Sequence, residues 1–93
     1  MAGATGQVTL NFGTHGTTAI AEVTGQAGLT SAGSVEPWFQ GDSTATNSVE
    51  NHAVLSSMCK PIARNITTGQ FSILAVSLEP VTGTFICHWV WSE

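Results

Sequence analysis

Residues 70–91 read QFSILAVSLEPVTGTFICHWVW, and this stretch decides the fold class of the chain. Residues 70–78 predict a strand with apolar side chains on both faces, because successive side chains of a strand point to opposite sides. One face carries Phe71, Ile73 and Ala75, and the other carries Leu74, Val76 and Leu78. Such a strand is expected to be covered on both sides. Residues 79–83 then predict a hairpin turn, and residues 84–91 predict the returning strand.

Two further strands are predicted near the N-terminus. Residues 7–12 (QVTLNF) alternate polar and apolar side chains, which is the period-two pattern of a half-buried strand. Residues 17–24 (TTAIAEVT) predict the next strand, in which Ile20 faces the core while Ala21 and Val23 line the other side.

The middle of the chain is richer in turn residues and polar residues. Leu29 lies between glycine-containing breaks and is expected to drop into the core. Residues 34–40 (SVEPWFQ) predict a strand that lies at a sheet edge or is interrupted at Pro37, because Pro37 cannot donate to a strand ladder. Residues 41–51 (GDSTATNSVEN) predict an exposed loop, and residues 48–53 could add a single helical turn.

The remaining residues complete an all-β pattern. Residues 53–58 (AVLSSM) and 61–67 (PIARNIT) predict one or two strands, split by Lys60 and Pro61. In total the sequence predicts about six to eight strands, with turns about every eight to twelve residues. This spacing is typical of a small antiparallel β-sandwich or barrel. We expect Greek-key or jelly-roll-like connections between the strands. The chain has 93 residues, so we expect one domain over residues 1–93.

Charged residues are scarce in this chain. They make up 9% of it, whereas an ordinary soluble domain carries about 25%. The net charge is −4, and Lys60 and Arg64 are the only Lys and Arg residues, which argues against a nucleic-acid or anionic-membrane partner. A surface made of small neutral residues resists association poorly. It indicates a protein covered by neighbours in an assembly; the alternative is a monomer that its hydroxyl groups keep in solution.

No leader segment is evident, because Met1 opens a run of small and polar residues. We therefore expect the protein to be made and folded in a cytoplasm. There, Cys59 and Cys87 are expected to be reduced thiols packed in the core, since their spacing fits neither a redox nor a zinc motif. A disulfide between neighbouring strands and a reactive-thiol enzyme are the alternatives.

The polar side chains suggest no catalysis, cofactor or metal. His15, His52 and His88 lie far apart, without the close ligand pair of a zinc site. Within and beside the polar loop, Asp42 and Glu50 could flank a glycosidic bond, or bind calcium together with Asn47. Turn and capping hydrogen bonds explain the same residues more simply. We therefore expect no enzyme, and keep Asp42, Asn47, Glu50 and His52 as candidate binding residues.

The tryptophans Trp38, Trp89 and Trp91 are the other candidates for an interface or a binding surface. Trp89 and Trp91 are two residues apart in one strand and share a face. Two adjacent indoles exceed what a thin core readily holds, so we expect one of them to be partly exposed, where Trp is common in binding hot spots. A subunit interface is favoured over a sugar-stacking platform, and packing of both rings in the core is the alternative.

Several segments resemble a family of small hypothetical proteins encoded among bacteriophage structural genes. The resemblance covers most of the chain from residue 23 onward and rests on the following segments. They are VTGQAG at residues 23–28, GDST at 41–44, the N..ENH element at 47–52, and TGTF at 82–85 leading to WVWS at 89–92. The resemblance implies a virion component.

The expected function is therefore that of a bacteriophage virion protein. It would be a head decoration (cement) protein or a tail, neck or fibre component that contacts major capsid or tail proteins and copies of itself, with a trimer as the expected symmetry. The alternative is a carbohydrate-binding module at a tail tip, with Trp91 or Trp38 as the stacking platform beside Asp42 and Asn47.

Overall fold

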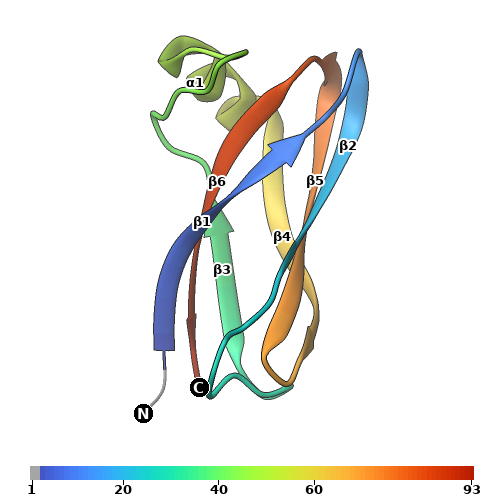
Figure 1. Ribbon diagram of the computed structural model, residues 1–93. Helices are drawn as coiled ribbons and strands as arrows, with labels where there is room; N and C mark the ends of the chain where they lie inside the picture. Colours follow the sequence, from blue (N-terminus) through green and yellow to red (C-terminus); the bar gives the residue numbers. More distant parts are fainter. Residues whose placement is uncertain (1–2) are drawn as a thin grey trace.

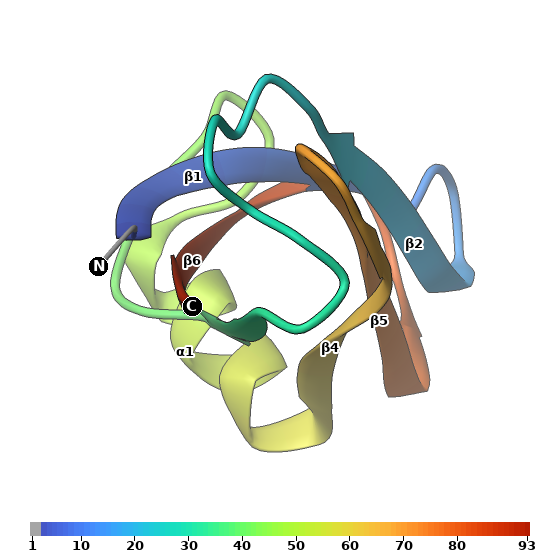
Figure 2. The same cartoon turned by 90° about the horizontal axis from the view of Figure 1, so that it is seen from below.

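Six strands and one helix form in the computed structural model, which describes residues 3–93 (Figure 1). They are β1 (Gly3–Asn11), β2 (Gly16–Val23), β3 (Ser34–Trp38), α1 (Val49–Met58), β4 (Cys59–Thr67), β5 (Gln70–Val81) and β6 (Thr84–Ser92). Two antiparallel sheets result, with strand orders β1-β6-β3 and β2-β5-β4. Seen from below, the two sheets lie on opposite sides of the molecule (Figure 2). The predicted small antiparallel β-sandwich is confirmed.

The core is filled by the inward-facing side chains of β5 and β6. Phe71 of β5 meets Trp89 of β6 edge to face, with ring centroids 5.4 Å apart. Trp89 and Trp91 are only 6% and 2% exposed, so the expectation that one of them would be partly exposed is wrong. Leu29 is 1% exposed, and its predicted place in the core is confirmed.

Small residues on β1 explain how both indoles fit. Gly6 pairs with Trp89, and Ala4 pairs with Trp91. A Cβ atom added to Gly6 would lie 2.5 Å from the Cζ2 atom of Trp89, so the ring occupies the space that a side chain on β1 would fill. Large residues on β6 thus lie opposite small residues on β1. The alternation of polar and apolar residues within each strand does not reveal this match.

The inward and outward faces of β2 are the reverse of those predicted. Ala19 and Val23 are buried, while Ile20 is 51% exposed. The register explains the reversal, because Ile20 pairs with Leu74 and Ala19 pairs with the buried Ala75. Ile20 therefore lies on the outer face of the sheet.

The outer face of β5 is uncovered, which contradicts the expectation that both of its faces would be buried. Phe71, Ile73 and Ala75 are buried as one set. On the opposite face Val76 is 53% exposed and Leu78 is 82% exposed. The reason is architectural: the β1-β6-β3 sheet packs against one side of β5, and no element within residues 3–93 forms a layer over the other side.

Helix α1 occupies residues that were predicted as a strand, residues 53–58. Ser48 caps its N-terminus, because the Ser48 side chain accepts a hydrogen bond from the backbone N–H of Asn51. His52 and Leu55, one turn apart, are its buried residues. The predicted single turn is thus the start of a ten-residue helix. Among residues 3–93, no helix is long and apolar enough to cross a membrane.

Pro37 and Pro61 both lie on edge strands. β3, which contains Pro37, is at an edge of its sheet as predicted, although it ends at Trp38. Lys60 and Pro61 do not split a strand, because β4 runs continuously from Cys59 to Thr67. β4 is itself an edge strand, which is where a residue without a backbone N–H is tolerated.

The close approach of Trp89 to β1 predicts that Gly6→Ala destabilises the protein. The added methyl group would press on the buried ring of Trp89, and such overpacking costs about 1–3 kcal/mol. Urea unfolding followed by tryptophan fluorescence measures the change. The outward-facing neighbour substitution Gln7→Thr should change the free energy of unfolding by less than about 0.5 kcal/mol. Equal stability of the two variants would contradict this packing.

Candidate functional site

Among the strands of the described residues, none pairs with the edge of β6 that lies beside α1. β3 pairs with β6 only as far as Trp38, which lies opposite His88. Beyond that point, the loop after β3 and the start of α1 lie alongside β6 (Figure 1). This stretch holds Asn47 and His52, two of the candidate binding residues, and their contacts show what it does.

Polar side chains of the loop satisfy the backbone of β6 at Thr84. The Oγ1 atom of Thr46 accepts a hydrogen bond from the Thr84 N–H at 2.9 Å. The Asn47 amide nitrogen donates to the Thr84 carbonyl at 2.8 Å and to the Thr82 carbonyl at 3.1 Å. Asn47 is only 8% exposed, so its amide is used within the fold. These side chains take the place of a strand at this edge, which otherwise would be open to pairing with another chain.

His52 continues the same edge with its ring. Its Nε2 atom lies 3.0 Å from the backbone nitrogen of Ile86 and accepts that N–H, so Nδ1 carries the proton and donates to the Ser48 carbonyl at 2.9 Å. The ring is 0% exposed and packs edge to face on Phe85, with centroids 5.0 Å apart. Both ring nitrogens are engaged, and His52 offers no surface to a ligand. Glu50 lies apart, exposed in the first turn of α1.

Asp42 and Trp38 meet at His88, on the outer face of the β1-β6-β3 sheet. A carboxylate oxygen of Asp42 lies 2.6 Å from His88 Nε2. The indole of Trp38 stacks on the same imidazole, with centroids 5.7 Å apart and planes inclined by 22°. The Trp38 Nε1 atom donates to the side chain of Gln40 at 3.0 Å. Trp38 is 36% exposed, so it is the one candidate tryptophan that reaches the surface.

The two thiols are buried and are not joined to each other. Burial raises the pKa of Cys87 to about 12, and the backbone hydrogen bond from Trp38 only partly opposes this effect. Burial likewise raises the pKa of Cys59. A thiol nucleophile requires the thiolate, which this environment disfavours. Among residues 3–93 no three His, Cys, Asp or Glu side chains gather in a way that could hold a metal ion.

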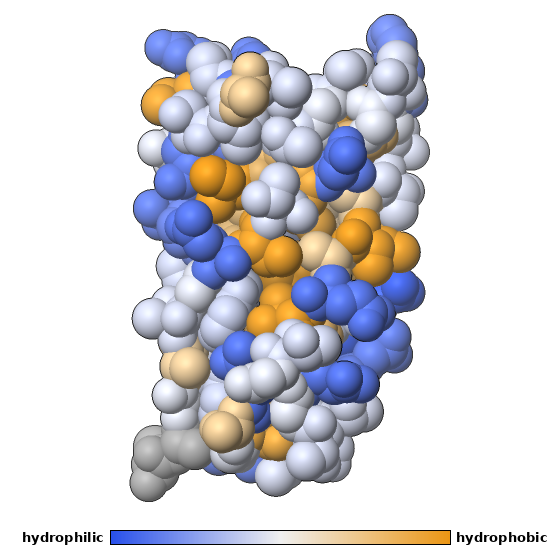
Figure 3. Space-filling view, viewed as in Figure 1, coloured by the Kyte–Doolittle hydropathy of each residue, from blue (hydrophilic) through white to orange (hydrophobic). Residues whose placement is uncertain are grey.

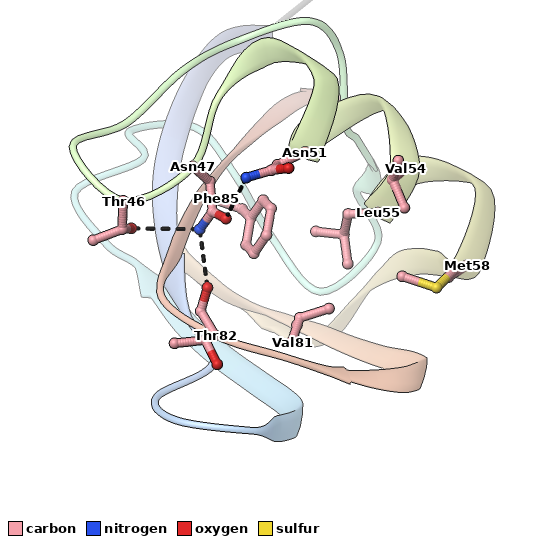
Figure 4. Close-up of a pocket in the computed structure, with 9 residues that line it drawn as sticks. All are labelled: Thr46, Asn47, Asn51, Val54, Leu55, Met58, Val81, Thr82 and Phe85. Carbon is pink, nitrogen blue, oxygen red and sulfur yellow. Dashed lines mark hydrogen bonds between the residues drawn. The ribbon is translucent and has the colours of Figure 1, made fainter.

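A cavity of about 380 Å³ lies between α1 and the β5–β6 turn (Figure 4). One wall is apolar and is formed by Val54, Leu55, Met58, Val81 and Phe85. At its polar end, Asn47 bonds to Thr46, Thr82 and Asn51. The polar groups at that end are thus paired with one another, and the cavity offers an apolar surface rather than an array of acid, base and nucleophile.

An uncovered apolar area lies on the outer face of the β2-β5-β4 sheet, which we call the contact face. Its apolar members are Ile20, Ile62, Leu74, Val76 and Leu78. In Figure 3 this sheet is seen from its edge, and apolar side chains reach the surface beside β2 and β5. None of these residues was a sequence candidate for a site. The sequence feature that could have indicated this face is the strand of residues 70–78, which carries apolar side chains on both of its faces.

Comparison of the chain with protein-family models, with curated proteins and with solved structures found no match.

The bonds made by His52 predict that His52→Leu is strongly destabilising. Leucine fills a similar volume but leaves the Ile86 N–H buried without an acceptor, which costs about 1–3 kcal/mol. Chemical denaturation measures this loss. Val54→Ala, at an exposed position of the same helix, is the control and should shift the free energy of unfolding by less than about 0.5 kcal/mol. A His52→Leu protein as stable as this control would refute the role assigned to the ring.

The raised thiol pKa values predict slow alkylation of the native protein. At pH 8, iodoacetamide should label Cys59 and Cys87 on the order of 100-fold more slowly in the folded protein than in urea, because burial removes both access and thiolate. Mass spectrometry follows the labelling. Ser57→Cys places a thiol at an exposed position of α1, and that thiol should react rapidly. A native cysteine that reacts as fast would revive the reactive-thiol hypothesis.

Proposed function

We propose that this chain is a structural protein of a bacteriophage particle. It acts as a head decoration protein or as a tail, neck or fibre component, through contacts with other virion proteins and with copies of itself. The observation that carries the proposal is the contact face, an uncovered apolar sheet surface on a chain with very few charges.

The contact face is unusual for a sheet that faces water. An antiparallel sheet with one solvated face normally presents alternating polar residues there. Here Leu78 is 82% exposed, Val76 53%, Ile20 51% and Ile62 49%. Single exposed apolar residues are common, but a contiguous set across three strands is typical of a surface that meets another protein. Covering it gains about 25 cal/mol per Å² of apolar area.

The family resemblance and the composition support the same proposal. The resemblance to proteins encoded among phage structural genes implies a virion component. A particle protein is stabilised by its neighbours through mass action, so it does not depend on a highly charged surface for solubility as a monomer.

The residues on which the carbohydrate-binding alternative depends are buried or already paired within the chain. Trp91 is 2% exposed and cannot stack on a sugar. Trp38 is already stacked on His88, and the Asp42 carboxylate is paired with the same imidazole. Asn47 is buried and bonded to the β6 backbone.

Incorporation into virus particles tests the proposal. Particles of a phage that carries this gene, purified on a density gradient, should contain the protein in a fixed ratio to the major capsid or tail protein. Leu78→Asp should lower that ratio by about tenfold, because a carboxylate would be buried in the contact. Val90→Asp is the control: Val90 is also exposed, but on the other sheet, and this variant should be incorporated normally. Particles without the wild-type protein would rule out the proposal.

A further inference from the structure

The charges on the contact face are arranged in a pattern that fits a second copy of this chain. Both basic residues, Lys60 and Arg64, lie on β4, at one edge of the face. Glu22 lies on β2, at the opposite edge. The pairing registers place the outward residues in rows that run across β2, β5 and β4. The rows are Glu22–Ser72–Arg64, Ile20–Leu74–Ile62 and Thr18–Val76–Lys60.

Glu22 and Arg64 do not pair with each other within the chain. They occupy one row, but β5 lies between their strands. Among residues 3–93 the one ion pair is that of Asp42 with His88. The Oγ atom of Ser72, between them in the row, donates to a Glu22 carboxylate oxygen at 3.3 Å. A carboxylate and a guanidinium therefore stand at opposite ends of one row, beside the row of Ile20, Leu74 and Ile62, and each is available to an outside partner.

We propose that two copies of this chain pack through their contact faces around a two-fold axis that runs parallel to β5. This inference rests on the proposed function, because it names the occupant of the contact face. Such a rotation reverses the order of the strands and keeps each row at its level. β2 of one copy then lies over β4 of the other, and β5 lies over β5. Glu22 meets Arg64 of the second copy, and the symmetry repeats the contact.

The charges also select this axis over the other two-fold arrangement. An axis in the plane of the sheet but perpendicular to the strands would reverse the rows and place β4 over β4. Lys60 would then oppose Arg64 of the second copy, and like charges brought together disfavour association. With the parallel axis, Ile20 packs on Ile62 of the second copy and no like charges are opposed.

The geometry sets the symmetry and the strength of the complex. A self-complementary face is fully occupied when two copies pack on each other, so the assembly ends at a dimer. We therefore expect a two-fold assembly in place of the trimer expected from the sequence. The face is only three strands wide, and neighbouring strands lie about 4.8 Å apart. Its area is therefore smaller than the roughly 800 Å² that each partner buries in a standard interface. We therefore expect a dimer that dissociates on dilution, with a dissociation constant on the order of micromolar.

Sedimentation velocity of the full chain tests the dimer. The wild type should sediment as a dimer at about 200 µM and as a monomer at about 0.1 µM. Leu74→Asp, at the centre of the face, should be monomeric at both concentrations, while Val90→Asp on the other sheet should behave as the wild type. Circular dichroism confirms that each variant is folded. A wild type that is monomeric at the higher concentration, or trimeric, would overturn the inference.

Charge exchange tests the orientation. Glu22→Arg and Arg64→Glu should each weaken the dimer by about tenfold, because each places like charges opposite each other twice. The double variant restores opposite charges and should return the dissociation constant to within about threefold of the wild type. A double variant weaker than both single variants would overturn the assigned axis. A monomeric protein that is nonetheless present in virions would remove the dimer alone, and a dimer absent from virions would remove the proposed function alone.

Discussion

One constraint governs this fold: β5 is apolar on both faces, and the chain supplies only one layer to cover it. Phe71, Ile73 and Ala75 are buried against the opposite sheet. The other face is left with Val76 and Leu78 in water. Within the described residues 3–93, no element forms a third layer over that face. The apolar area that remains is what connects this fold to a role in an assembly.

The covered side of the sandwich depends on a match between large and small side chains. Trp89 and Trp91 fill the interior because Gly6 and Ala4 stand opposite them on β1. On β2, Ala19 points inward and Ile20 points outward, because Ala19 pairs with the buried Ala75 and Ile20 pairs with Leu74. The same packing that stabilises the core thus adds a bulky side chain to the contact face.

The β6 edge shows how the fold limits its own open surfaces. Where β3 ends, Thr46, Asn47 and His52 supply the hydrogen bonds that a neighbouring strand would make. This edge is therefore closed to strand pairing, whereas the contact face is open to packing.

The sequence predicts the sandwich class, the edge position of β3 and the burial of Leu29, because these follow from local alternation, Pro37 and turn residues. The sequence does not predict which side chains of β2 point inward, or that both indoles are buried. These features depend on the residues that lie opposite each other on neighbouring strands and on the facing sheet. The sequence also misses α1, because the apolar residues 53–58 resemble a strand until Ser48 is recognised as a helix cap. Of the candidate residues, Asn47 and His52 proved to be part of the edge, since a sequence pattern does not distinguish buried from exposed polar groups.

A methyl NMR titration against protein concentration tests the role of the contact face most directly. As the concentration rises, the methyl resonances of Ile20, Ile62, Leu74, Val76 and Leu78 should shift together, while those of Val54 and Val90 should stay in place. Shifts confined to Val54 and Val90, or no shift at any methyl group, would contradict a surface built to contact a second copy.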